Sequence, residues 1–208
     1  MKAMTVNLKE FSLPIDRIKE EAALHRRLIL LYAVFFAGCF AGAALYSNSA
    51  DILAGYIKNF LEKILNADYS QNLRLITAIY LIPQIVTALC SFSALGLPFV
   101  LLCPGICGML LSGFISYLYC TFSVDGAVFS LIMLLPCAVV FFVMLLIGCN
   151  EGLILSEIVA GSIFSTQKQG RGELKGFFIR FAVILLVCFF VALLQAVCIS
   201  RFGKALLF

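Results

Sequence analysis

The sequence is poor in the residue types that catalysis and metal binding need. It has one histidine, and Asp, Glu, Lys and Arg make up 12% of its 208 residues, against about 25% in soluble domains. With His25 alone and scarcely any carboxylate in the apolar stretches, neither acid–base catalysis nor a metal site is easily assembled. The sequence has no H-E-x-x-H motif, no paired aspartates in facing spans and no glycine-rich phosphate loop. We therefore expect neither an independent enzyme nor a bound cofactor or metal.

Charge is also too sparse for two other classes of protein. No basic tract is long enough to form a nucleic-acid patch, and the net charge is only +4. The apolar stretches contain no ring of charged residues of the kind that lines many ion channels. We expect no nucleic-acid partner.

Apolar sequence, by contrast, is abundant. Hydrophobic residues make up 63% of the chain, and a bilayer core is crossed by a helix of about 20 apolar residues. The sequence predicts an all-α polytopic membrane bundle, treated as a single domain, with a cytoplasmic arm over 1–27. Five stretches are long enough to cross: about 28–47, 75–92, 97–120, 127–149 and 177–200.

The first of these stretches is expected to remain as a span. It begins after 27 residues of mixed charge and lacks an A-x-A exit, unlike a cleavable signal peptide. A sixth, short span at about 152–166 would place the C-terminus on the other side, but Glu151 and Glu157 make that segment too polar and too short.

The positions of the cations predict the orientation. Ten of the 15 Lys and Arg residues lie in the N-terminal arm or before the last span, and five lie on the other side. The positive-inside rule then places the N-terminus in the cytoplasm and the C-terminus outside.

Nine cysteines are present, all within or at the edges of apolar stretches. Buried free cysteine behaves as a small hydrophobe. Cys103 and Cys107 share a helix face at i, i+4, but no histidine or carboxylate accompanies them, so a metal site is not expected there.

Small residues indicate two close-packing faces. Gly38 and Gly42 lie four apart in the first span, and the third span holds Gly105, Gly108, Ser112 and Gly113. Such spacing lets helices approach closely in lipid. The pattern predicts helix packing or partner contact, and leaves open whether the partner is another span or another protein.

Two prolines predict kinks in the third and fourth spans. Pro104, followed by Gly105, should kink its helix or begin it afresh, and Pro136 is a second kink point, because proline removes a backbone donor. Some transporters build binding sites from such broken helices.

The segment 51–66 is amphipathic and predicts an interfacial helix. It either packs on the mouth of the bundle or offers a docking face to an outer partner. Glu151, at the cytoplasmic end of the fourth span, is predicted to be an interfacial polar anchor or to pair with a residue of the next loop.

Between Ser91 and Ser156 small and aromatic residues recur at fixed spacing. They are Phe92-Ser93-Ala94-Leu95-Gly96, Gly105, Gly108, Ser112-Gly113, Tyr117-Leu118-Tyr119, Gly126, Leu134-Leu135-Pro136, Glu151 and Ser156. On these residues the stretch resembles the stage II sporulation protein M family, in its short clostridial-type form, which implies a bacterial plasma membrane. In place of the basic residue that often precedes the glutamate in related sequences, this chain has Asn150.

The resemblance implies a membrane scaffold that recruits peptidoglycan-degrading partners during forespore engulfment. The kinked third and fourth spans leave a second hypothesis open: a permease subunit of a transporter or exporter that works with an ATPase. A third is a structural membrane protein without a dedicated partner.

Overall fold

The computed structural model describes residues 9–48, 50–93, 96–164 and 171–207, and these residues are almost entirely helical. No strand occurs in these ranges, and the prediction of an all-α membrane bundle is confirmed. The elements in chain order are α1 (Lys9–Asn48), α2 (Ala50–Asn66), α3 (Tyr69–Ser91), α4 (Leu97–Phe129), the π-helical segment η2 (Ser130–Leu134), α5 (Leu135–Phe164) and α6 (Arg171–Leu207).

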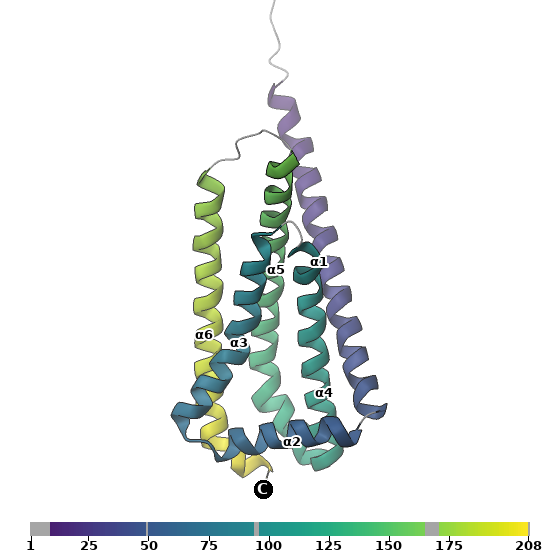
Figure 1. Cartoon of the computed structure of the whole chain (residues 1–208), viewed down its shortest axis with the longest axis vertical. Helices are drawn as coiled ribbons and strands as arrows, with labels where there is room; N and C mark the ends of the chain where they lie inside the picture. Colours follow the sequence, from purple (N-terminus) through teal and green to yellow (C-terminus); the bar gives the residue numbers. More distant parts are fainter. Residues whose placement is uncertain (1–8, 49, 94–95, 165–170, 208) are drawn as a thin grey trace, which may run out of the picture.

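Five of the described helices, α1, α3, α4, α5 and α6, contain apolar stretches long enough to cross a membrane. The third apolar stretch, Leu97–Val159, contains 63 residues, which as one helix would measure about 95 Å, about three times the hydrocarbon core. The chain instead reverses at Ser123, where φ is 51° and ψ is −118°, so that α4 and α5 run side by side (Figure 1). The other stretches are His25–Ser47, Tyr69–Ser91 and Lys175–Gly203. Residues 152–164 continue α5 and add no separate span.

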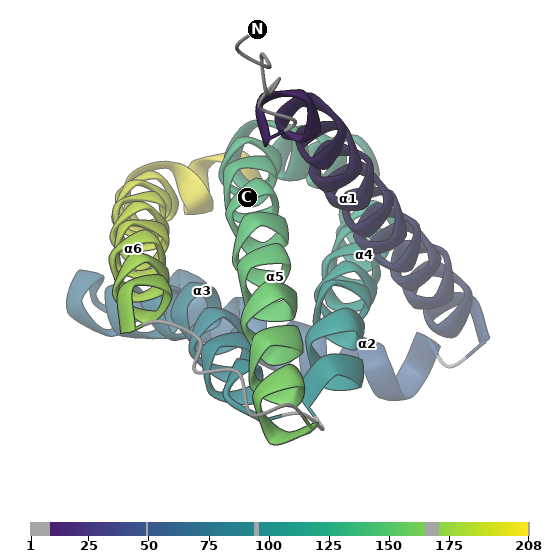
Figure 2. The same ribbon diagram turned by 90° about the horizontal axis from the view of Figure 1, so that it is seen from above.

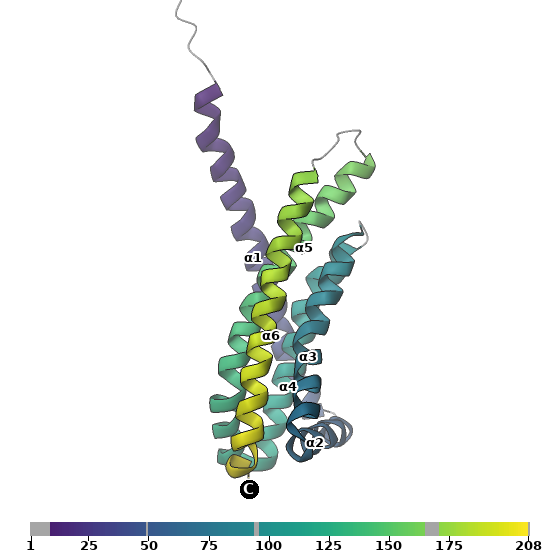
Figure 3. The ribbon, with the colours of Figure 1, turned by 90° about the vertical axis from the view of Figure 1, so that its left-hand side faces the viewer.

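The long helices alternate in direction, and α2 lies across one end of them (Figures 1 and 3). We call this the α2 end, which also holds the α4–α5 reversal and the last turns of α6. We call the opposite end, where α1 begins and α5 meets α6, the arm end. The arm predicted over 1–27 is helical from Lys9, and residues 1–8 lie outside the described ranges.

Viewed along the bundle, α5 lies between α6 and α4, and α1 lies outside α4 (Figure 2). Leu145 and Cys149 of α5 are fully buried, in a cluster with Leu31 of α1 and Val100 of α4. The outward-facing side chains are mostly large and apolar, which suits contact with lipid.

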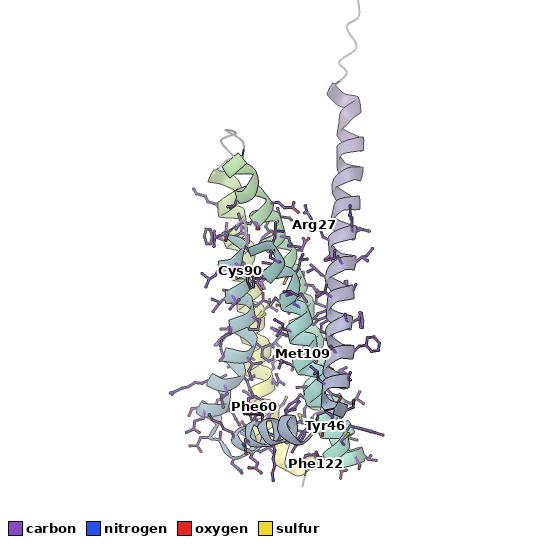
Figure 4. All side chains as sticks on the ribbon, turned by 45° about the vertical axis from the view of Figure 1, so that its right-hand side comes forward. Arg27, Tyr46, Phe60, Cys90, Met109 and Phe122 are labelled. Atoms are coloured by element: carbon purple, nitrogen blue, oxygen red, sulfur yellow. The ribbon has the colours of Figure 1, made fainter. Side chains whose placement is uncertain are left out.

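The amphipathic helix α2 packs on the mouth of the bundle, the first of its two predicted roles. Leu61 and Ile64 are only 4% and 5% exposed, and Leu61 joins a core cluster with Tyr46 and Tyr117. Figure 4 shows Tyr46, Phe60 and Phe122 gathered at this end. The charged face of α2 points outward.

The two predicted kink residues have different surroundings. α4 continues through the buried Pro104 without restarting, and Ser123 is its only non-helical residue. Pro136 lies two residues after the end of the π-helical turn η2. A widened turn can accommodate a proline ring that would otherwise clash with the carbonyl four residues earlier, here that of Ile132.

Candidate functional site: helix seams and bundle ends

The small residues of α1 pack directly against those of α4, so their partner is another span of the same chain. A Cβ atom on Gly38 would overlap the backbone carbonyl of Gly105, and one on Gly42 would overlap the carbonyl of Met109 and the hydroxyl of Ser112. We call these five residues the glycine seam.

Two further glycines of α4 lie in the same interface with α1. A Cβ on Gly108 would lie 2.7 Å from the carbonyl oxygen of Phe35, and one on Gly113 would lie 3.9 Å from that of Gly42. The six small residues predicted from sequence therefore lie along one interface within the chain. Such close approach is what holds helices together in lipid, where the hydrophobic effect between them is weak.

Glu151 is an interfacial anchor with a partner on the next helix. Its carboxylate lies 3.3 Å from the Arg180 guanidinium of α6, and its side chain is 14% exposed whereas that of Arg180 is 60% exposed. The pair joins α5 to α6 near the arm end. The neighbouring Asn150 is buried, and its Oδ1 atom has no hydrogen-bond partner.

A second ion pair, not predicted from sequence, joins α5 to α1. Arg27 pairs with Glu157, the two side chains being 29% and 49% exposed. Figure 4 shows Arg27 on the side of α1 that faces the other helices. Sequence analysis had treated Glu157 only as a reason against a sixth span. Its separation of 130 positions from Arg27 gives no local signal of the contact.

Residues that carry the family resemblance meet at the α3–α4 connection. The Ser156 hydroxyl of α5 donates to the carbonyl of Ser93 at 2.9 Å, and Phe92 stacks on Phe178 of α6 at 5.8 Å between ring centroids. A Cβ on Gly96 would overlap the Cys90 carbonyl, so glycine is required at this turn. Ala94 and Leu95 lie outside the described residues.

The buried face of α3 is polar over its last two turns. Gln84 and Ser91 are fully buried and Thr87 is 1% exposed. The hydroxyls of Thr87 and Ser91 donate to backbone carbonyls of their own helix, at 2.8 and 2.6 Å. Glycines of α5 face this side of α3: a Cβ on Gly148 would lie 2.6 Å from Gln84 Oε1, and one on Gly152 would overlap the Ser91 hydroxyl. We call Gln84, Thr87 and Ser91 of α3, together with Gly148 and Gly152 of α5, the polar seam. It was not predicted from the sequence.

The nine cysteines are free thiols, and all except the exposed Cys120 are at least partly buried. Thr87 contacts Cys103 and Cys149, at 3.5 and 4.0 Å between oxygen and sulfur, and Gln84 Nε2 donates to the sulfur of Cys188 at 3.7 Å. Within the described ranges no group of three His, Cys, Asp or Glu side chains is placed to hold a metal ion. The thiols thus act as weak partners for buried polar groups.

Comparison with known proteins found no matching family model, no matching curated protein and no matching solved structure.

Proposed function

We propose that this chain is a non-catalytic membrane scaffold that recruits peptidoglycan-degrading partners to the septum during forespore engulfment. The resemblance over Ser91–Ser156 suggests this role. One structural observation supports it: the small-residue faces are occupied within the chain, as at Gly38 and Gly105. That leaves the two polar ends of the bundle as the surfaces for protein partners.

The proposed orientation places the arm end in the cytoplasm of a bacterial cell and the α2 end outside. Among the residues whose side chains the structure describes, Arg26, Arg27, Lys175 and Arg180 lie toward the arm end, and more basic residues lie in the adjoining parts of the sequence. Outer partners would then meet the charged face of α2 and the α4–α5 reversal.

Deleting the gene and following the cells by electron microscopy after starvation tests the role. Arrest with a thick, uncleared septum is the expected result. Normal engulfment would contradict it. A complementing chain that carries an affinity tag should also co-purify septal hydrolases.

A permease subunit is the second candidate, and buried amides in the spans favour it. Gln84 and Gln195 are 0% and 4% exposed, and the Oε1 atom of each has no hydrogen-bond partner in the described structure. Polar groups at membrane depth often mark solute pathways. Co-purification of an ATPase in place of outer hydrolases would favour this function.

A further inference from the structure

A cavity that opens to the surface lies at the α2 end, between the first turn of α3 and the last turns of α6. It has a volume of about 310 Å³, and its lining residues, all exposed, are Tyr69 of α3 and Val197, Ser200 and Arg201 of α6. One water needs only ~15 Å³ of such space, so the cavity can admit a larger group. α2 packs beside both helices, since its Ile64 lies in one buried cluster with Ile76 of α3 and Val191 of α6.

The lining of the cavity suits a phosphate group. Arg201 takes part in none of the ion pairs formed by the described residues. Its guanidinium can donate two parallel hydrogen bonds to phosphate oxygens. The hydroxyls of Tyr69 and Ser200 can donate further bonds, and Val197 supplies an apolar wall.

The position of the cavity indicates where that phosphate comes from. The start of α3 and the end of α6, which line it, lie near α2 (Figure 1), an amphipathic helix of the kind that lies among lipid headgroups. Val197 and Phe202, which are 45% and 56% exposed, continue the apolar surface of α6 toward the bilayer. A lipid can therefore place its phosphate beside Arg201 while its chains stay in the hydrocarbon layer.

We propose that Tyr69, Ser200 and Arg201 form a binding site for the phosphodiester of a phospholipid headgroup at the α2 end. The bound lipid would join the start of α3 to the end of α6. This site is independent of the proposed scaffold role, since any membrane that holds the bundle supplies the ligand.

The chain contains no tryptophan, so Tyr69→Trp places a single tryptophan reporter on the cavity wall and puts the indole N–H donor in place of the phenolic O–H. The full-length variant in detergent is titrated with phosphatidylcholine that carries a nitroxide on its headgroup, and quenching gives a dissociation constant. Adding Arg201→Ala should raise that constant about fivefold, since a charge-assisted phosphate contact is lost. Adding Arg74→Ala, an exposed arginine on α3 outside the cavity lining, should leave it unchanged.

Equal dissociation constants of the labelled lipid for the Arg201→Ala and Arg74→Ala proteins would overturn the proposal. Displacement of the labelled lipid by millimolar inorganic phosphate would also overturn it, by showing that the site takes the free anion. If Tyr69→Trp fails to fold, Val197→Trp on the opposite wall carries the same comparison.

Discussion

The backbone of Gly38 in α1 lies against the backbone of Gly105 in α4, with no room for a side-chain carbon on Gly38. α1 is otherwise the most lipid-exposed of the spans, with 11% of its most apolar window buried. Its attachment to the bundle therefore depends strongly on this contact, and the Arg27–Glu157 ion pair adds a smaller contribution.

Replacing Gly38 by alanine should destabilise the bundle by about 1–3 kcal/mol, because the added methyl group forces α1 and α4 apart. Gly55→Ala is the matched control, since a Cβ there meets nothing within 4 Å. Thermal unfolding in detergent measures the stability of both variants. Equal stability of the two variants would show that α1 and α4 do not approach as described.

Ser123→Gly should stabilise the protein. Ser123 is the only residue other than glycine with positive φ among the described residues, and its angles are ones that glycine adopts without strain. The expected gain is about 1 kcal/mol. Chemical denaturation of the wild-type and Ser123→Gly proteins provides the measurement, and Ser123→Ala serves as control because alanine keeps the strain.

The polar seam predicts coupling between Gln84 and Gly148. Gly148→Ala should destabilise the protein by about 1–3 kcal/mol, because the new methyl group would meet Gln84 Oε1 at 2.6 Å. Shortening the amide with Gln84→Ala in the same chain should recover part of that loss. A double-mutant cycle measures the coupling, and strictly additive effects would contradict the contact.

The Glu151–Arg180 pair should contribute only about 1 kcal/mol, because the arginine is 60% exposed and water screens it. Glu151→Gln and Arg180→Gln, alone and together, measure this coupling energy. The pair Lys58–Glu62, with side chains 64% and 57% exposed, is the control and should couple more weakly. A larger coupling in the control pair would mean that Glu151 is not held as the structure shows.

Local properties of the sequence were sufficient to predict the long apolar helices and the amphipathic helix. Hydropathy depends on a short window, and each window here is strongly apolar. Glycine spacing also located the close-packing faces. It could not identify α4 as the partner of α1, because pairing depends on which helices meet in space.

The polar seam of α3 was missed for a different reason. The Thr87 hydroxyl donates to the carbonyl of Pro83 within its own helix at 2.8 Å. It therefore needs no polar partner elsewhere in the chain, and the sequence pattern does not indicate that it is buried. The Arg27–Glu157 ion pair could not be predicted from the sequence either, because only the fold brings those two residues together. Side chains that satisfy themselves locally or pair at long range leave little signal in one sequence.

The arrangement of the two ends is tested most directly by adding one exposed cysteine at a time and labelling it from one side of the membrane. Asp125→Cys at the α4–α5 reversal and Lys175→Cys at the arm end both replace exposed residues. Each is made in a chain that also carries Cys120→Ser, because Cys120 is itself exposed. A membrane-impermeant maleimide should label Asp125→Cys in intact cells and Lys175→Cys only after permeabilisation. Labelling of both from outside would contradict the five-pass bundle, and labelling of Lys175→Cys alone would reverse its orientation.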